Sequence, residues 1–99
     1  MNWQVYIILC TDNSLYTGIT CDVERRMLQH AASRGAKYFR GRKPRQLVYL
    51  ESGHTRSSAS KREALIKKLK RPEKQALIAS VMNELDGPAT MEKQAPDFR

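Results

Sequence analysis

The sequence has few cysteines and no long hydrophobic run, and both scarcities exclude classes of protein. Its two cysteines, Cys10 and Cys21, form no CxxC or Cys/His motif, so neither a disulfide framework nor a zinc site is expected. We interpret both as reduced thiols of a cytoplasmic protein. The longest apolar run, residues 5–10, is far shorter than the roughly 20 residues of a membrane-spanning helix. No basic segment precedes that run, which argues against a signal peptide.

Acidic residues are scarce in the middle of the chain. Of the 99 residues, 18 are Lys or Arg and 10 are Asp or Glu, a net charge of +8. Residues 25–74 hold 16 of the basic residues and three acidic ones, a net charge of +13. A small domain typically needs a net charge of only about 2–8 in magnitude to be soluble. The segment therefore predicts an anionic partner, with nucleic acid the first candidate. No segment pairs a large basic face with Trp, Phe and Leu on the opposite face, so no membrane partner is expected.

Hydrophobic patterning predicts one α+β domain over residues 1–85, followed by a loose tail over residues 86–99. Strand-forming residues and turn residues alternate at the start of the chain and predict an antiparallel hairpin with strands over 3–10 and 15–20. A third strand is expected over residues 46–51.

Three helices are expected between and after these strands. The first covers about residues 23–33, with Asp22 as N-cap, and the second covers about 59–70. The third begins near Pro72 and has an apolar face of Leu77, Ile78, Val81, Met82 and Leu85. The order β-β-α-β-α-α predicts a three-stranded antiparallel-type sheet packed against helices.

Polar residues interrupt the apolar stripe of the first expected helix. His30 lies in the middle of the stripe and Arg26 at its border, whereas Arg25 points to solvent. A polar residue within an apolar stripe must find a partner. Taken alone, His30 is a satisfied core histidine and Arg26 a helix arginine whose stem covers apolar surface.

A set of spaced residues points to a family. Tyr6 lies within Val5-Tyr6-Ile7, and Tyr16 follows ten residues later in Tyr16-Thr17-Gly18. Arg26 comes after another ten residues, and Glu63 lies on the next expected helix. This arrangement resembles the GIY-YIG endonuclease domain, most closely its small stand-alone bacterial branch, which is similar to a structure-specific endonuclease subunit. The resemblance covers roughly residues 3–80, and the stretches 16–30 and 35–40 carry most of it.

The resemblance implies a metal-dependent DNA endonuclease that hydrolyses phosphodiester bonds and selects structure rather than sequence. Tyr6 would be the general base, with a nearby cation lowering its pKa and His30 accepting its proton. Tyr16 would bind the nucleophile or the phosphate, and Arg26 would clamp the phosphoryl oxygens. Glu63 would hold one Mg²⁺ or Mn²⁺ ion. Branched or damaged DNA is the candidate substrate, and a protein partner is a second source of selectivity.

Basic residues beyond these five are expected to bind the phosphate backbone. The basic stretch 34–45 encloses aromatic residues that can stack on unpaired bases, and the second helix adds lysines and Arg62. The predicted nucleic-acid contacts are Lys37, Tyr38, Arg40, Arg42, Lys43 and Lys67.

Ordinary structural roles compete with the catalytic ones. Tyr6 and Tyr16 taken alone are typical strand aromatics that pack across a sheet. The sequence Ser60-Lys-Arg-Glu63 fits a capping box, in which Glu63 would only hold the start of its helix. An earlier cap at Ser57 or Ser58 would instead leave Glu63 free to face the site.

Two departures from the family pattern keep other functions open. The first triplet is Val-Tyr-Ile rather than Gly-Ile-Tyr, and the asparagine that many members carry after the glutamate has only Gln75 and Asn83 as counterparts. These departures are compatible with a non-catalytic nucleic-acid-binding module on the same fold. A third hypothesis is an interaction domain that docks a partner through the last helix.

Overall fold

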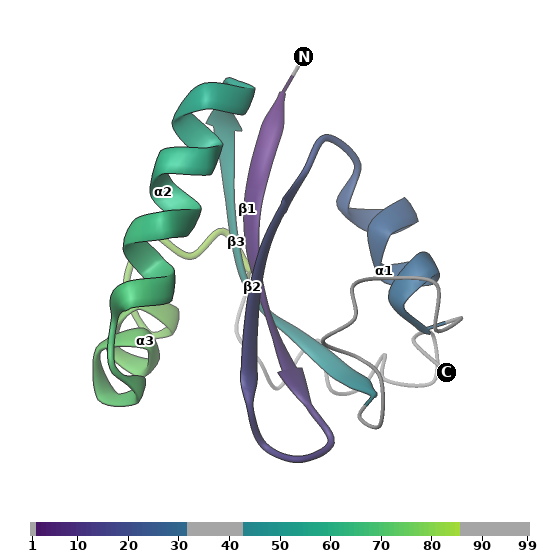
Figure 1. Cartoon of the computed structure of the whole chain (residues 1–99), viewed down its shortest axis with the longest axis vertical. Coiled ribbons are helices and arrows are strands. Elements are labelled where there is room, and N and C mark those ends of the chain that lie inside the picture. Colours follow the sequence, from purple (N-terminus) through teal and green to yellow (C-terminus); the bar gives the residue numbers. More distant parts are fainter. Residues whose placement is uncertain (1, 32–42, 86–99) are drawn as a thin grey trace.

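The computed structural model describes residues 2–31 and 43–85, so the predicted tail and most of the basic stretch 34–45 lie outside the described residues. The elements of the described part are, in order, β1 (Trp3–Cys10), β2 (Leu15–Thr20), α1 (Val23–Ala31), β3 (Pro44–His54), α2 (Arg56–Lys68) and α3 (Arg71–Ile78). The predicted order and the α+β class are confirmed. Helices α2 and α3 lie on one side of the sheet and α1 on the other (Figure 1). No helix of this part is long and apolar enough to cross a membrane.

The sheet has the strand order β2-β1-β3, and β1 pairs antiparallel with both neighbours. Strand β3 is longer than the predicted 46–51 because it pairs along the whole of β1, from Trp3 opposite His54 to Cys10 opposite Pro44. Central position buries β1 on both faces, which explains its continuous run of apolar residues.

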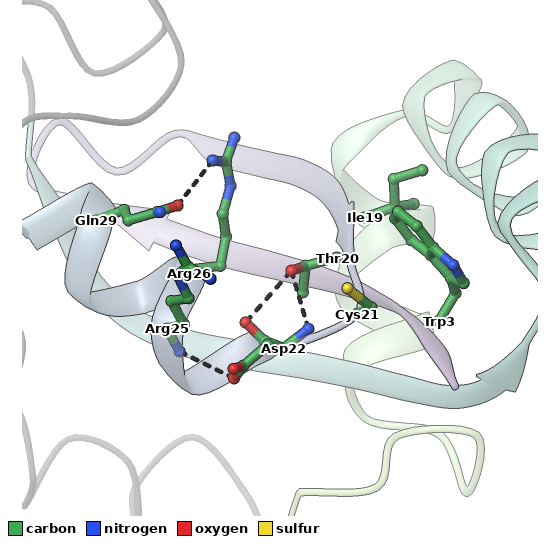
Figure 2. A pocket seen from close by; sticks show the side chains of 8 residues that line it. All are labelled: Trp3, Ile19, Thr20, Cys21, Asp22, Arg25, Arg26 and Gln29. Carbon is green, nitrogen blue, oxygen red and sulfur yellow. Dashed lines mark hydrogen bonds between the residues drawn. The ribbon is translucent and has the colours of Figure 1, made fainter. Parts of the chain in front are cut away.

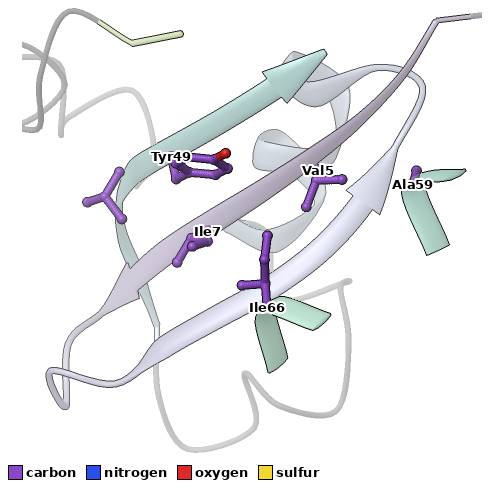
Figure 3. Packing of buried hydrophobic residues seen from close by; sticks show 6 residues of the cluster. Val5, Ile7, Tyr49, Ala59 and Ile66 are labelled. Carbon is purple, nitrogen blue, oxygen red and sulfur yellow. The ribbon is translucent and has the colours of Figure 1, made fainter. Parts of the chain in front are cut away.

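The face toward α2 holds the larger apolar cluster. Val5, Ile7 and Tyr49 from the sheet pack with Ala59 and Ile66 from α2 (Figure 3). Ala59 and Ile66 are seven residues apart and therefore lie on the same side of their helix. All five side chains are fully buried, so this contact holds α2 against the sheet.

The face toward α1 holds the second cluster. Successive strand residues point to opposite faces, so Tyr6, Ile8 and Cys10 pack on this side together with Met27 of α1. Cys10 is buried and Cys21 is exposed, and the two do not form a disulfide. Tyr6 is thus the one residue of the first triplet that faces α1.

Helix α2 begins at Arg56, three residues before the predicted start near residue 59. That prediction is wrong because Thr55 caps the helix. The Thr55 hydroxyl accepts a hydrogen bond from the Ser58 backbone N–H at 3.1 Å, and the Ser58 hydroxyl accepts one from the Thr55 N–H at 3.0 Å. This is a capping box with serine in the place of the usual glutamate. Glu63 therefore takes no part in the start of α2.

Helix α3 has Pro72 in its first turn, as predicted, but it ends at Ile78. The predicted helical face through Leu85 is wrong because Asn83 ties the following chain to the sheet. Its amide Nδ2 donates to the Ile78 and Val48 carbonyls, both at 2.8 Å. Val81, expected on the apolar face, is fully exposed instead.

The docking stripe of the interaction-domain hypothesis does not exist as one surface. Leu77 packs against the cluster under α2, whereas Leu85 packs against the cluster that contains Tyr6. The two leucines thus pack against opposite faces of the sheet.

Candidate active site

Two tyrosines from neighbouring strands form the centre of the candidate site. Tyr6 of β1 lies opposite Gly18 of β2, and Tyr16, two residues before Gly18, lies opposite Ile8, two residues after Tyr6. Such diagonal neighbours share one face of a sheet. The ring centroids are 6.3 Å apart and the rings are tilted by 46°. Strand pairing therefore brings together two of the predicted catalytic residues.

Gly18 makes room for the Tyr6 ring. A Cβ atom added to Gly18 would lie 2.5 Å from the Tyr6 hydroxyl oxygen and 2.6 Å from the ring carbon that bears it. Both distances are far below van der Waals contact, so no larger residue fits without moving Tyr6. The glycine of the Tyr16-Thr17-Gly18 motif thus has a steric cause: it sets the position of the hydroxyl in the other strand.

Replacing Gly18 with alanine is therefore expected to destabilise the fold by about 1–3 kcal/mol, the usual cost of overpacking a core. Gly53→Ala is the matched control, because Gly53 has a φ of 82° and open space around its missing side chain. That control strains only the backbone. Urea unfolding should show both losses, but only Gly18→Ala should move the Tyr6 ring, which near-ultraviolet circular dichroism of the folded protein would detect. A Gly18→Ala spectrum identical to that of the wild type would contradict the steric role.

Arg26 approaches the tyrosines from α1. Asp22 caps this helix as predicted, since its Oδ1 accepts from the Arg25 N–H at 3.1 Å. A hydrogen bond joins Arg26 to the Tyr6 hydroxyl. Nη1 of Arg26 donates to Oε1 of Gln29 at 3.1 Å (Figure 2), while its buried Nε finds no acceptor among the described residues. The guanidinium is thus incompletely satisfied, which is unusual for a purely structural arginine.

Burial raises the pKa of Tyr6 from 10.0 to about 12. The hydrogen bond and the positive charge of Arg26 lower it, whereas the charges of Tyr16 and Glu63 raise it further. The predicted nearby cation is present and lowers the pKa of Tyr6, but loss of solvent on burial raises that pKa by more. Tyr6 is therefore a neutral phenol at neutral pH.

Glu63 on α2 is linked to this group electrostatically, since its charge is one cause of the raised pKa of Tyr6. Its side chain is 24% exposed, and its Oε2 lies 3.5 Å from Nζ of Lys67. No three His, Cys, Asp or Glu residues of the described part gather into a metal cage. A single accessible carboxylate nevertheless fits Mg²⁺, which proteins often hold through one or two carboxylates with water and phosphate completing the shell.

Several predicted contacts lie outside the described residues. These are Lys37, Tyr38, Arg40 and Arg42, together with the side chain of His30, whose backbone belongs to α1. Lys43, just before β3, and Lys67, near the end of α2, are both exposed. Their roles in nucleic-acid binding stay predictions.

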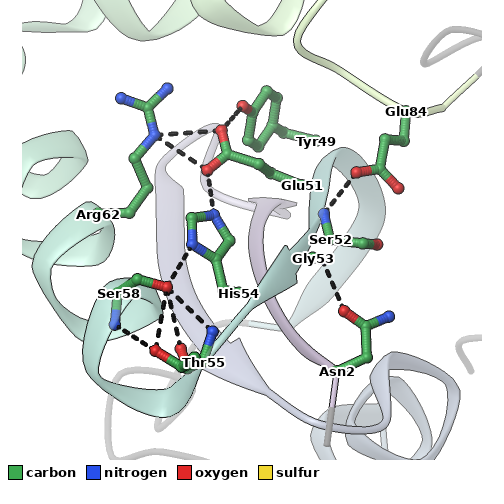
Figure 4. A network of polar contacts seen from close by, with 10 residues as sticks. All are labelled: Asn2, Tyr49, Glu51, Ser52, Gly53, His54, Thr55, Ser58, Arg62 and Glu84. Atoms are coloured by element: carbon green, nitrogen blue, oxygen red, sulfur yellow. Dashed lines mark hydrogen bonds and ion pairs between the residues drawn. The ribbon is translucent and has the colours of Figure 1, made fainter.

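A buried polar network around Glu51 was missed by the sequence analysis. Glu51 of β3 accepts from the Tyr49 hydroxyl at 2.5 Å and from Nε of Arg62 at 3.1 Å, and it contacts Nε2 of His54 at 2.6 Å (Figure 4). Nδ1 of His54 lies 2.9 Å from the Ser58 hydroxyl. The network therefore joins β3 to α2, the helix that carries Glu63.

The Glu51 carboxylate is kept charged by its neighbours. Burial by itself would raise its pKa, but hydrogen bonds from Tyr49 and His54 and the charge of Arg62 lower it. Arg62, predicted to bind backbone phosphate, is instead engaged with Glu51. The available signal was the i,i+2 spacing of Tyr49 and Glu51, which puts both on one face of the strand.

Comparisons with known proteins identify relatives along most of the chain. A family profile described as the GIY-YIG catalytic domain matches residues 2–76. A UPF0213 protein of Haloquadratum walsbyi is 58% identical over 73 residues, which cover 74% of this chain and 82% of the relative. The solution structure of a UPF0213 protein from Bacillus halodurans is 40% identical, with a TM-score of 0.55 and 94% of each chain covered. A second solution structure, of a protein from E. faecalis, is also 40% identical, with a TM-score of 0.57 and coverage of 80% of this chain and 84% of that one.

Proposed function

Because this chain belongs to the GIY-YIG catalytic domain family, whose members are generally nucleases, we propose that it is a metal-dependent endonuclease that hydrolyses phosphodiester bonds of DNA. The observation that carries the proposal is that Tyr16 and Arg26 adjoin Tyr6, while the charge of Glu63 is near enough to raise the pKa of the Tyr6 phenol. Phosphodiester hydrolysis needs a group that orients and deprotonates water and a cation for the phosphoryl oxygens. The group around Tyr6 contains both kinds of side chain.

Each side chain has its own role in the proposed reaction. Arg26 binds the phosphoryl oxygens, because its planar guanidinium presents several donors and is only partly satisfied within the protein. The Tyr6 phenol, protonated at neutral pH, donates a hydrogen bond to the attacking water or the phosphate and accepts the water proton only after losing its own. His30 is the expected acceptor of that proton, and Tyr16 orients the nucleophile.

Glu63 would hold the divalent cation, Mg²⁺ or Mn²⁺. When bound, that ion supplies positive charge for the leaving oxygen. The ion pair with Lys67 is exposed and therefore weak, so a divalent cation can displace it at small cost. The Glu51 network keeps α2, and with it Glu63, in place on the sheet.

The test is incubation of the purified protein with single-stranded, duplex, flap and junction DNA of matched sequence. Cleavage is expected with Mg²⁺ or Mn²⁺ and none with EDTA, because a single carboxylate without its ion leaves the departing oxygen unstabilised. Branched DNA is expected to be cut faster than plain duplex. Absence of metal-dependent cleavage on all four substrates would contradict the proposal.

A second candidate function is a non-catalytic nucleic-acid-binding module. It is favoured by the use of Asn83 in the structure, since its amide is committed to the Ile78 and Val48 carbonyls and is not available to a site. This module would bind DNA with an affinity that falls steeply with salt concentration, yet cut none of the four substrates.

A further inference from the structure

A cavity of about 240 Å³ lies beside the candidate active site and shares Arg26 with it. Its lining comes from the edge of the sheet and the first turns of α1 and consists of Trp3, Ile19, Thr20, Cys21, Asp22, Arg25, Arg26 and Gln29. In Figure 2 the arginines lie at one end and Trp3 with Ile19 at the other. The cavity is therefore cationic at the end next to the catalytic group and apolar away from it.

The cationic end has an unused binding group. The Arg25 side chain is exposed, and within the described residues no acceptor pairs with its guanidinium. The Arg26 guanidinium, in contrast, donates one hydrogen bond to Gln29. Asp22, the one acidic residue of the lining, is occupied as the cap of α1. A phosphate group is the ligand that suits such an end.

The apolar end offers an aromatic surface. Trp3 is partly buried, and the guanidinium carbon of Arg56, which is not a lining residue, lies 5.6 Å from its ring centroid. A flat apolar ring near a cation is how proteins bind single nucleotides of an unpaired strand, with the base stacked and the backbone held by charge. A base inside a duplex has both faces covered and cannot reach an indole in this way.

We propose that this cavity binds the nucleotide next to the scissile phosphate, with its phosphate on Arg25 and its unpaired base against Trp3. The proposal rests on the proposed function, because Arg26 sets the place of the scissile phosphate. If so, the protein selects DNA that has an unpaired nucleotide beside the cleaved bond.

Trp3 is the sole tryptophan of the chain, so its fluorescence reports the cavity directly. The titration uses the full chain in EDTA, with a flap oligonucleotide and a fully paired duplex of the same length as probes, and fluorescence anisotropy of labelled DNA to confirm binding. The flap is expected to quench Trp3 saturably, and the duplex is expected to bind without quenching. Equal Trp3 emission with bound flap and without it would overturn the proposal.

Arg25→Ala should raise the dissociation constant for the flap by at least about tenfold, as for a lost charge-assisted contact. Lys68→Ala removes the same charge from an exposed position at the end of α2 and should have a smaller effect. In cleavage assays Arg25→Ala should raise KM with little change in kcat. Equal effects of both variants would overturn the proposal. Quenching without any cleavage would support nucleotide binding in the cavity and contradict the nuclease function. Cleavage without quenching would support the nuclease function and contradict nucleotide binding in the cavity.

Discussion

Tyr6→Phe is expected to lower the DNA cleavage rate by about 10²–10⁴-fold, the usual contribution of a general acid–base group. The substitution keeps the ring that fills the space over Gly18 and removes only the hydroxyl at the centre of the site. Because the pKa of Tyr6 is raised to about 12, its ionised fraction grows about tenfold per pH unit between pH 6 and 9. The wild-type rate should rise along the same slope, and the rate of Tyr6→Phe should be low and flat.

Tyr49→Phe is the matched control for this experiment. Tyr49 is equally buried, and its pKa is likewise raised to about 12, chiefly by burial and then by its bond to Glu51. Loss of the Tyr49 hydroxyl should cost about 1.5–3 kcal/mol of stability, because the missing hydrogen bond goes to a charged carboxylate, and should leave the pH profile unchanged. A Tyr6→Phe variant that keeps the rising profile would exclude Tyr6 as the base.

The altered first triplet has a physical interpretation. Val5 and Ile7 point toward α2 and belong to the core, while Tyr6 alone points to the site. Residues on either side of the tyrosine therefore affect the packing of α2, and the site depends on Tyr6 and on Gly18 opposite it. The departure from the family pattern lies in the core rather than in the catalytic group.

Much of the fold follows from local signals in the sequence. The first hairpin has alternating strand and turn residues, and the start of α1 has an aspartate cap, so both were predicted close to their observed bounds. The start of α2 was misplaced because Thr55 and Ser58 form a capping box without an acidic residue. The end of α3 depends on Asn83 reaching Val48, a contact that no local pattern contains.

The sequence predicts which residues the candidate site contains, but it does not predict the pKa of Tyr6 or the polar network around Glu51. The spacing of Tyr6, Tyr16 and Arg26 anticipates their proximity, which the structure describes. The raised pKa of Tyr6 depends on burial by the whole second cluster, and burial is a property of the assembled fold. The network of Glu51 with Arg62 joins residues eleven positions apart through tertiary packing and leaves no motif.

Glu63→Gln is expected to reduce metal-dependent cleavage by on the order of 10³-fold, since a lost metal site removes several kcal/mol of transition-state stabilisation. The amide keeps the size of the side chain and cannot disturb the start of α2, which depends on Thr55 and Ser58. DNA binding in EDTA should be unchanged or slightly tighter, because Lys67 loses its partner and becomes free for phosphate.

Glu24→Gln is the matched control, because it removes the same charge from an exposed position in the first turn of α1. If Glu63 holds the ion, Mn²⁺ titration of the DNA complex should show weaker ion binding in Glu63→Gln and no change in Glu24→Gln. Equal rates in wild type and Glu63→Gln would mean that the cation is held elsewhere or is not needed. Equal losses in both variants would instead assign the effect to net charge. The site assignment predicts a loss of cleavage and of ion affinity together, at Glu63 alone.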